Sequence, residues 1–388
     1  MEKIVAGEFS EAYPPLMDGV GQVVKNYERI LRDEYGYNVY VVTTYDSKTG
    51  IPDTDNHAII RFPMHVIKRL GAYGITVMKR DIKKKAAGID YDIIHTHSPF
   101  SIGSLGRRIA KKKHIPHVTT FHSQFRTDVL DFTHSKMLAD IVTKYLVRHY
   151  KKADAVIAPN HRSAEVLRSY GYKGPVTIIE NATDMEIPSQ EKEEEYRAHA
   201  LSLLGLCAKT RPVLLFVGQH SDKKNIPLII ESLRILKDKG IDFQMVFVGD
   251  GEDRKKYVEM IREYGLQDNV IFYGITRNRE DIAAFYSLSD LAVFPSLYDT
   301  SSLVKRESAA HATPCLLVES VTSEGVKDKF NGFIAKPDAA SYAEYIEEIL
   351  SDNSLRRTVG ENARRTLYRN FSDAVRELDE LYRKLIAN

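Results

Sequence analysis

Residues 291 to 312 of the chain read LAVFPSLYDTSSLVKRESAAHA. The apolar run Leu291–Phe294 is typical of a buried strand, and the segment from Glu307 to Ala312 is typical of a helix. A turn of small residues separates the two. Backbone N–H groups near a helix start have no partner within the helix and lie at the positive end of its dipole, so they bind phosphate well. The sequence therefore predicts a phosphate site at the N–H groups of Ser301, Ser302 and Leu303.

Two carboxylates flank this turn. Asp299 precedes it, and Glu307 follows after a gap of seven residues. A carboxylate does not bind phosphate, but it accepts hydrogen bonds readily from hydroxyl groups. We therefore expect Asp299 and Glu307 to bind the hydroxyls of a sugar and of a ribose, which indicates a nucleotide sugar. The alternative is an ordinary strand, turn and helix whose two acidic side chains are solvated.

Short apolar runs alternate with helical patterns along the chain, which predicts parallel sheets covered by helices on both faces. The predicted fold class is α/β, with two doubly wound domains. Strands are expected near Ile4, Val39–Thr43, Ile93–His95, Val118–Phe121, Ala155–Ala158 and Val176–Ile179, and then at Val213–Val217, Met245–Val248, Val270–Phe272, Leu291–Phe294 and Cys315–Val318. Sheets of this kind bind ligands at the carboxyl ends of their strands, so the expected site is the cleft between the domains.

The length of 388 residues is sufficient for two domains. We expect the first domain to span residues 1–182 and the second to span residues 183–373. The acidic stretch Ile187–Glu195 is the expected linker. Residues 374–388 form the last helical pattern of the chain.

The chain resembles retaining glycosyltransferases of the GT-B fold, family 4 (glycosyl transferases group 1), nearly from end to end. Besides the turn before Glu307, the matching segments are Asp92–Phe100, Thr119–His122, Phe216–Gln219 with Lys223–Asn225, Val248–Gly251 and Val270–Gly274. The resemblance implies two Rossmann-like domains, the first for the acceptor and the second for the nucleotide sugar. It also implies that the last helix, about 374–388, packs back on the first domain.

What the resemblance implies for the site can be stated residue by residue. His122 would face the transferred sugar, Lys224 would stabilise the leaving diphosphate, Glu307 would hold the ribose and Asp299 the sugar. The positions that would contact the donor are Gly19, Gly21, Gly218, Gln219, Gly249, Ser301, Ser302 and Leu303. The family needs no cofactor beyond the donor substrate and no metal ion. The donor phosphate helps to deprotonate the acceptor, so no enzymatic nucleophile is required.

The sequence departs from the family pattern at three positions. Gln219 stands where an arginine is usual, Asp299 replaces the more usual glutamate, and Asp18 replaces the first glycine of the glycine-rich loop. Loss of the arginine would cost ~1.5 to 3 kcal/mol of charge-assisted bonding to the leaving group. We expect Arg306 or Lys305 to compensate. Because these positions would contact the donor, we expect the three departures to affect which nucleotide sugar the protein prefers.

Other polar motifs in the sequence have simpler structural explanations. His95 and His97 could take part in the site or simply cap a strand. Asp53 and Asp55 have the spacing of a glycosyltransferase metal motif but follow Gly50-Ile51-Pro52 in a loop, so we predict no metal site there. The turn Gly249–Gly251 lacks the third glycine of a dinucleotide fingerprint.

Charge is divided unevenly along the chain. Residues 1 to 180 hold 27 Lys and Arg against 19 Asp and Glu, a formal charge of +8, whereas the rest carries −6. The lysine runs at 83–85 and 111–113 are either solvated helix faces or a surface for membrane lipid or a phosphorylated acceptor. No nucleic-acid module is present. The absence of a long apolar run, the absence of a signal peptide and the two cysteines, both expected to be buried, predict a cytoplasmic protein with possible contact at the inner membrane face.

The sequence thus predicts a retaining, metal-independent hexosyltransferase that uses a UDP- or GDP-sugar. Its acceptor would be a lipid, a sugar or a small molecule. The segments His95–Gly103 and Thr120–Gln124 look most like the subgroup that glycosylates diacylglycerol. Two alternatives stay open, a nucleotide-sugar epimerase of the same fold and a catalytically weak nucleotide-sugar-binding subunit.

Overall fold

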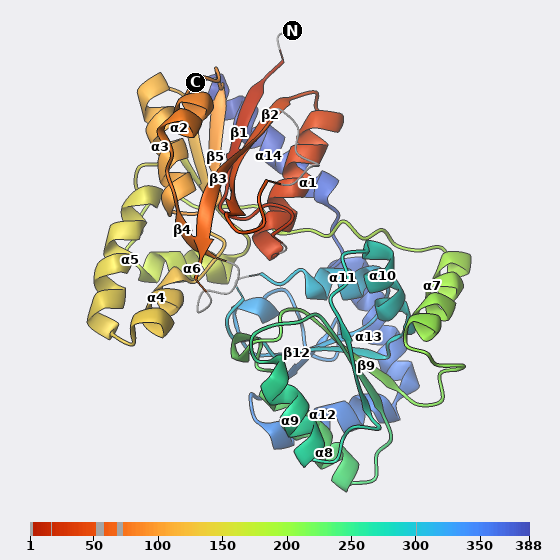
Figure 1. Ribbon diagram of the computed structural model, residues 1–388. Coiled ribbons are helices and arrows are strands. Elements are labelled where there is room, and N and C mark those ends of the chain that lie inside the picture. The colour runs from red at the N-terminus through yellow and green to blue at the C-terminus, as the bar shows by residue number, and fades with distance from the viewer. Residues whose placement is uncertain (1–2, 17, 52–57, 68–72, 300) are drawn as a thin grey trace. The chain divides into compact units, whose positions relative to one another are not determined.

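A computed structural model describes residues 3–16, 18–51, 58–67, 73–299 and 301–388. The chain divides into two compact units (Figure 1). Unit 1 comprises Met1–Ala182 and Phe371–Asn388, and unit 2 comprises Thr183–Asn370. Each unit contains its own sheet and its own apolar core. Within the described ranges, no helix is both long and apolar enough to cross a bilayer.

The sheet of unit 1 has, over the described residues, eight strands in the order β4-β3-β2-β1-β5-β6-β7-β8. Neighbouring strands are parallel except β3 and β4, which are antiparallel. The strands are β1 (Val5–Phe9), β2 (Asn38–Asp46), β3 (Ile59–Val66), β4 (Gly74–Thr76), β5 (Ile93–Thr96), β6 (His117–Thr120), β7 (Ala155–Ala158) and β8 (Thr177–Ile178). The strand order reverses between β1 and β5.

Helices cover both faces of this sheet (Figure 1). On one face, α1 (Gly19–Asp33) and α14 (Phe371–Ile386) pack apolar side chains against Ala6, Ile93 and Val118. On the other, α2 (Arg80–Ala87) and α3 (Ser101–Lys113) pack against Phe9 and Ile94. The remaining helices are α4 (Phe125–Thr133), α5 (Lys136–Tyr150) and α6 (His161–Ser169). The last helix of the chain therefore completes the core of the first unit.

The sheet of unit 2 is parallel throughout its described strands, in the order β11-β10-β9-β12-β13-β14. These are β9 (Val213–Val217), β10 (Gln244–Val248), β11 (Val270–Gly274), β12 (Leu291–Phe294), β13 (Cys315–Val318) and β14 (Phe333–Ala335). Its α-helices are α7 (Gln190–Leu203), α8 (Ile226–Asp238), α9 (Arg254–Glu263), α10 (Arg279–Leu288), α11 (Val304–Ala310), α12 (Ala339–Ser351) and α13 (Asn353–Thr366). In this sheet the order reverses between β9 and β12.

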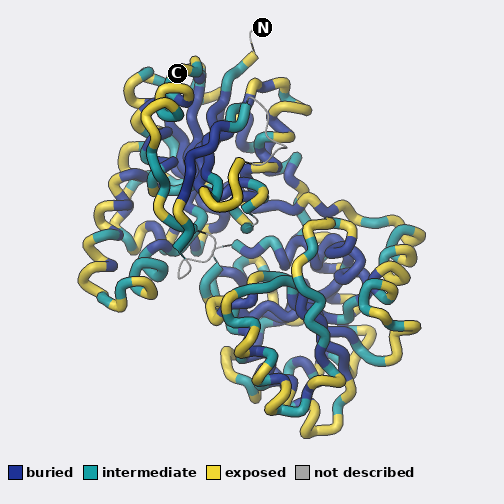
Figure 2. The backbone as a smooth tube through the Cα atoms, viewed as in Figure 1, coloured by how far each residue is buried: buried dark blue, intermediate teal, exposed yellow. Residues whose placement is uncertain are grey.

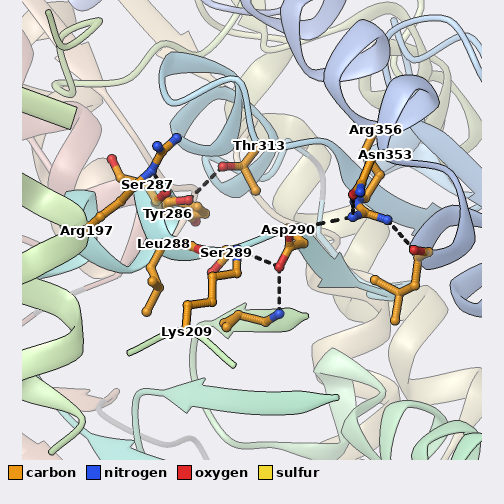
Figure 3. Close-up of polar contacts among 12 residues, drawn as sticks. Arg197, Lys209, Tyr286, Ser287, Leu288, Ser289, Asp290, Thr313, Asn353 and Arg356 are labelled. Carbon is orange, nitrogen blue, oxygen red and sulfur yellow. Dashed lines mark hydrogen bonds and ion pairs between the residues drawn. The ribbon is translucent and has the colours of Figure 1, made fainter. Parts of the chain in front are cut away.

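Burial follows the same plan in both units. Figure 2 shows buried strands, whereas the outer turns of helices such as α7 and α9 are exposed. The start of β12 is held by Asp290, which accepts from the backbone N–H of Val213 at 2.7 Å and pairs with Lys209 at 2.7 Å (Figure 3). Arg356 approaches Asp290 from α13 at 3.9 Å. These contacts fix the strand that leads into the predicted phosphate turn.

The fold is the predicted α/β class, with parallel sheets covered by helices. The eleven expected strands are present within a few residues of their predicted positions, and β3, β4 and β14 are additional. The expected linker Ile187–Glu195 is wrong, because α7 begins at Gln190. Ser189 caps this helix by accepting from the N–H of Lys192 at 3.2 Å, and acidic residues in a first turn favour a helix because they complement its dipole. The prediction of a buried Cys207 is also wrong, since this thiol is exposed, whereas Cys315 is buried.

Candidate functional site

In each unit, the carboxyl ends of the two strands where the order reverses carry the polar residues singled out in the sequence. Ligands of doubly wound sheets bind outside this switch point, because the loops there leave the sheet in opposite directions and open a crevice. In unit 2 the switch point is formed by the loops after β9 and β12. In unit 1 it is formed by the ends of β1 and β5, beside β6.

At the unit 2 switch point, Lys224 and Asp299 form an ion pair. Lys224 ends a short 3₁₀ turn after β9, and its Nζ lies 2.6 Å from Oδ1 of Asp299. Asp299 is held from its other oxygen by the Oγ of Ser296, which donates at 2.5 Å. Both charged side chains are partly buried. An ammonium group has three donors, so Lys224 retains the capacity to bind an anion beside Asp299.

The turn between β12 and α11 ends earlier than the predicted helical segment Glu307–Ala312. Helix α11 begins at Val304, three residues before Glu307, with Leu303 as its N-cap residue. The Oγ of Ser302 accepts from the N–H of Val304 at 3.1 Å. Ser302 is buried, while Ser301 and Leu303 are partly exposed. Thr300 lies outside the described residues.

Glu307 is buried inside α11 and has two partners on α10. Its Oε1 accepts from Arg279 at 2.7 Å, and its Oε2 accepts from the hydroxyl of Tyr286 at 3.1 Å. Arg279 also contacts Asp184 at 2.5 Å. The two carboxylates raise the pKa of Arg279 above its ordinary value despite its burial, so this guanidinium stays charged. Since each carboxylate oxygen has two lone pairs, Glu307 can accept further bonds.

The expectation that Arg306 or Lys305 replaces the missing arginine is wrong for the structure described. Lys305 is buried and donates to the carbonyl oxygens of Thr322 at 2.9 Å and Glu324 at 2.6 Å. Arg306 is buried and donates to the carbonyl oxygen of Leu367 at 2.8 Å. Both side chains therefore bind backbone carbonyls of unit 2 from the packed side of α11. Sequence position on a helix did not reveal which face was buried.

The other donor-contact positions of unit 2 gather at the ends of β9 and β10. Gln219 is exposed in the loop after β9. Gly249 has φ +129°, and a Cβ added there would lie 2.0 Å from the carbonyl oxygen of Gly218. The close approach of these two loops therefore requires glycine at 249. Such bare backbone lets a ligand approach the sheet edge.

The glycine loop of unit 1 already contains a carboxylate. Asp18 is the N-cap of α1 and accepts from the N–H of Gly21 at 2.6 Å, while the hydroxyl of Tyr73 donates to its second oxygen. A Cβ at Gly19 would meet nothing within 4 Å, whereas one at Gly21 would crowd the loop. A phosphate could therefore reach the N–H of Gly21 only if Asp18 turned away. The departure at Asp18 thus has a direct structural effect.

His122 belongs to a buried polar network at the unit 1 switch point. Its Nε2 lies 3.0 Å from Nδ1 of His97, and Nε2 of His97 lies 2.7 Å from Oε2 of Glu8. The other oxygen of Glu8 accepts from the hydroxyl of Tyr382 at 2.9 Å. His95 contacts the same hydroxyl through Nδ1 at 2.7 Å. The expected site residue is therefore linked to Glu8 through His97.

Strand geometry explains why these groups meet. Side chains two residues apart in a strand point to the same face. Ala6, Ile93 and Val118 form the apolar core under α1 and α14, and the polar residues Glu8, His95 and Thr120 follow two positions later on β1, β5 and β6. One further step along the same face leads to His97 and His122. The core is thus apolar along most of the strands and polar only at their carboxyl ends.

Burial shifts the titration of this network. Desolvation raises the pKa of Glu8 to about 8, although the hydrogen bond from Tyr382 opposes the shift. It lowers the pKa of His97 to about 3 and those of His95 and His122 well below their ordinary value. The imidazoles are therefore neutral at physiological pH, and the carboxyl group titrates close to it.

A metal ion is a second possible use for such a cluster. Among the described residues, Glu8, His95 and His97 form the one group of three metal-binding side chains whose ligand atoms lie within 4.8 Å of one another. Each of these side chains is already hydrogen bonded, and both ring nitrogens of His95 are engaged, by Tyr382 and by Thr120 at 2.7 Å. We interpret the cluster as a hydrogen-bond network. Asp53 and Asp55 lie outside the described residues.

Three residues of the candidate site were missed by sequence reasoning. Glu8 stands within the apolar strand Val5–Phe9, and a carboxylate in such a run is a signal that could have been used. Arg279 and Tyr382 gave no such signal, because their partners lie 28 and 374 residues away.

Two family models match the chain. The model described as Glycosyltransferase Family 4 matches residues 17–187, and the model described as Glycosyl transferases group 1 matches residues 206–366. The alpha-monoglucosyldiacylglycerol synthase of Acholeplasma laidlawii is 26% identical over 341 residues, which cover 84% of this chain and 83% of that protein. The protein of the same name from Streptococcus pneumoniae is 28% identical over 316 residues, covering 80% and 70%.

Solved structures resemble the chain over almost its full length. Sucrose-phosphate synthase from Thermosynechococcus elongatus superposes with a TM-score of 0.79 at 21% identity, covering 100% of both chains. HepE from Anabaena in complex with UDP-glucose superposes with a TM-score of 0.75 at 16% identity, covering 99% of this chain and 100% of that chain. At these identities the likeness shows the fold.

Proposed function

Because the chain is a GT-B hexosyltransferase of glycosyltransferase family 4, we propose that it transfers a hexose from a nucleotide-diphosphate sugar to the hydroxyl of a membrane lipid. The proposed reaction retains the anomeric configuration and needs no metal ion. The observation that carries the proposal is the unit 2 switch point, where Lys224, Asp299 and Glu307 come together around the β12–α11 turn. A cation, a backbone turn and two carboxylates are the groups that a sugar diphosphate requires.

The donor is a UDP- or GDP-hexose, with UDP-glucose the first candidate. Among similar folds, HepE was solved with UDP-glucose, and the relatives include two proteins named alpha-monoglucosyldiacylglycerol synthase. Lys224 binds the diphosphate and stabilises its charge as the glycosidic bond breaks. Glu307 accepts from the ribose hydroxyls, and Asp299 accepts from the sugar. His122 of unit 1 is proposed to bind a sugar hydroxyl.

Retention follows in the proposal from attack on the same face that the leaving group departs. A donor phosphate oxygen takes the proton of the acceptor hydroxyl, so no side chain has to form a covalent intermediate. In the pair described here, Asp299 neutralises Lys224 at 2.6 Å. When a diphosphate binds, Lys224 shares its donors between the two anions, and Asp299 gains capacity for a sugar hydroxyl. In the proposal, Lys224 supplies the positive charge at the diphosphate that a divalent cation would otherwise supply.

The proposed acceptor is a diacylglycerol-type lipid, as the names of the relatives suggest. A lipid acceptor requires contact with a bilayer, and α4 and α5 offer a suitable surface. Met137, Ile141 and Tyr145 lie along one side of α5 and are 73%, 56% and 67% exposed, with Phe132 of α4 also exposed. Exposed Lys136, Lys144 and Arg148 stand beside them. Apolar side chains flanked by basic groups fit an anionic membrane surface.

The lysine runs at 83–85 and 111–113 lie on α2 and α3 and are partly or fully exposed. They add basic charge to unit 1 outside α5. Vesicle cosedimentation separates the two contributions. Ile141→Glu should reduce binding to anionic vesicles at low and high salt, whereas Lys83→Glu should reduce it only at low salt, because salt screens charge. Ile275→Glu, at an exposed apolar position of unit 2, is the matched control. Equal, negligible binding to anionic and neutral vesicles would refute the membrane contact.

The test of function is transfer itself. Purified protein should be incubated with UDP- and GDP-hexoses and with vesicles that contain diacylglycerol, and the lipid products identified by mass spectrometry and by the anomeric proton coupling. We expect an α-linked glycolipid from an α-linked donor. A β-linked product would refute retention. Nucleotide release without any glycosylated product, or conversion of the donor sugar into its epimer, would favour the two alternatives, a weak binding subunit or an epimerase.

A further inference from the structure

A cavity of about 810 Å³ opens at the end of the unit 1 sheet that is opposite the switch point. Two of its lining residues are His117, which begins β6, and Asp154, which directly precedes β7. The cavity therefore lies at the amino ends of these strands. His122 follows the carboxyl end of β6, and five residues of extended chain span roughly 16 Å. The cavity is thus separate from the residues of the candidate site.

Three cationic side chains line this cavity. Arg107 and Lys111 lie one turn apart on α3, and Lys152 lies in the turn before β7. No carboxylate of the described residues forms an ion pair with any of the three. Asp154 instead accepts from the backbone N–H of His117 at 2.8 Å. The charged side chains of the lining therefore carry three positive charges and one negative charge.

The guanidinium group of Arg107 has no hydrogen-bond partner among the described residues, although its Nε is buried. Other guanidinium groups of the chain are bound. Arg61 of the same unit donates to the carbonyl oxygens of Thr44 at 3.0 Å and Pro14 at 2.5 Å, and Arg279 of unit 2 lies beside two carboxylates. A charge that is partly withdrawn from water without a partner is unfavourable, and a bound anion would supply that partner.

The side chains behind Arg107 are uncharged. Oγ1 of Thr96 lies 2.9 Å from Nε2 of His117 and 2.9 Å from Nε2 of His149. Burial, and then the charge of Arg107, lowers the pKa of His117 to about 3. Burial, and then His117 and Arg107, lowers the pKa of His149 to about 2. Both imidazoles are therefore neutral at physiological pH, and neither is a counter-ion for Arg107.

We propose that this cavity binds a phosphate ester, whose phosphate group is held by Arg107, Lys111 and Lys152. A guanidinium group can donate to two phosphate oxygens side by side, and ammonium groups bind phosphate as point charges. The cavity is larger than a bare phosphate requires, and its volume lies in the range of about 300 to 1,000 Å³ that is usual for small-molecule sites.

The body of the ester is uncharged, because apolar side chains complete the lining. These are Ile115 before β6 and Leu385 and Ile386 at the end of α14. Both a soluble organic phosphate and a phospholipid headgroup have this chemistry. The proposal does not rest on sugar transfer, since the cavity lies at the other end of the sheet from His122.

Isothermal titration of the full chain with butyl phosphate and with inorganic phosphate tests the site. Butyl phosphate should bind more tightly, because its chain contacts the apolar wall. Arg107→Gln should weaken its binding about tenfold or more, since charge-assisted bonds to the phosphate are lost. Lys152→Glu changes an exposed residue and should weaken binding to a similar extent in a folded protein. Arg108→Gln is the matched control, because exposed Arg108 donates to the carbonyl oxygen of Ser104 at 3.0 Å, and it should keep the affinity within about twofold.

Lys224→Ala distinguishes this cavity from the unit 2 switch point, and its affinity for butyl phosphate should equal that of the wild type. Cosedimentation with phosphatidylglycerol and phosphatidylcholine vesicles then identifies the source of the phosphate. Weaker binding of Arg107→Gln than of Arg108→Gln to phosphatidylglycerol vesicles would assign it to a lipid headgroup. Equal vesicle binding by the two variants, with butyl phosphate bound only by Arg108→Gln, would assign it to a soluble ester. Binding of both probes that does not depend on Arg107, or no binding of either, would overturn the proposal.

Discussion

The two switch points use opposite electrostatics for the same position in the fold. In unit 2 the strand ends hold formal charges, with Lys224 paired to Asp299 and Arg279 paired to Glu307. In unit 1 they hold imidazoles kept neutral by burial, beside Glu8, whose pKa burial raises to about 8. A charged site suits a doubly charged leaving group, whereas a neutral one suits hydroxyl groups. The difference predicts that substitutions in unit 2 change the rate and that substitutions in unit 1 change the dependence on pH.

The largest effect is expected at Lys224. Lys224→Ala should lower kcat about 100-fold and donor affinity much less, because the leaving group gains charge in the transition state. Steady-state kinetics with a titrated donor measures both. Lys223→Ala is the control, since the Nζ of this neighbour lies 4.6 Å from the centre of the Tyr298 ring. Equal losses in kcat and affinity would mean that Lys224 contributes only ground-state binding.

Glu307→Gln should weaken nucleotide binding and lower turnover at least tenfold while the fold persists. The amide keeps the shape but places an NH₂ group toward Arg279 or Tyr286, and it accepts a ribose hydroxyl less strongly. Isothermal titration with UDP and with GDP, together with circular dichroism, gives affinity and folding separately. Normal donor affinity and rate in the variant would contradict the proposal that Glu307 binds the ribose. Lys224 would then be the remaining charged residue that distinguishes the unit 2 site from the unit 1 site.

In unit 1, substitution of Glu8 should change how the stability of the protein depends on pH. Glu8 has a raised pKa, so its stabilising contribution is complete below about pH 4.5 and is lost as pH rises to about 8. Glu8→Gln cannot ionise and should lack this loss, and the two proteins should diverge by about 2 kcal/mol between pH 6 and pH 8. Melting followed by circular dichroism suits a chain without tryptophan. Parallel curves for the two proteins would show that Glu8 titrates elsewhere.

Acid should destabilise unit 1 by the opposite linkage. The pKa of His97 is depressed from 6.5 to about 3, so its contribution is complete above pH 6.5 and is lost as pH falls through that interval. His97→Phe should flatten the acid side of the stability curve. If the melting temperature of the variant falls with decreasing pH as steeply as that of the wild type, the loss of stability in acid comes from the other buried histidines.

The smallest effect is expected from chelation. If Lys224 supplies the positive charge at the diphosphate, excess EDTA should leave the rate within about twofold of its value in buffer. Complete loss of activity in EDTA that Mn²⁺ or Mg²⁺ restores would show that a metal ion supplies the positive charge at the diphosphate. The electrostatic difference between the two units would then have no basis. The measurement is best made with the same donor and vesicles as the transfer assay.

Local patterns predicted much of this structure. The run Leu291–Phe294 and the small-residue turn placed the β12–α11 site within three residues, because a buried strand and a helix start both have strong local signals. Lys224 and Asp299 were each predicted to contact the donor, but their ion pair spans 75 residues and has no local pattern. The same holds for Arg279 beside Glu307 and for Tyr382 beside Glu8. Contacts between distant elements depend on packing, which periodicity does not encode.

The errors have physical causes too. The segment Ile187–Glu195 suggested a linker because it is acidic, has no strand pattern and lies between the two domains. A helix that begins after Ser189 with glutamates in its first turn is nevertheless favoured by its cap and its dipole, and only Ala200 of this helix is buried. Arg306 or Lys305 was expected to compensate for the positive charge that is missing at Gln219. Their stems run into the packed side of the unit, where carbonyl oxygens at helix and loop ends replace water as partners.

Helix α14 gives the chain a particular order of assembly. It is made after all of unit 2, yet Tyr382, Leu378 and Val375 belong to the core of unit 1, and Tyr382 donates to Glu8 on its first strand. Domains generally begin to fold from the N-terminal end during synthesis. Here unit 1 leaves the ribosome first, but its core is completed only after unit 2 has been made. The buried Glu8 lacks its partner Tyr382 until α14 emerges. A nascent chain stopped after unit 2 would therefore leave uncovered the apolar side chains of unit 1 that pack against α14.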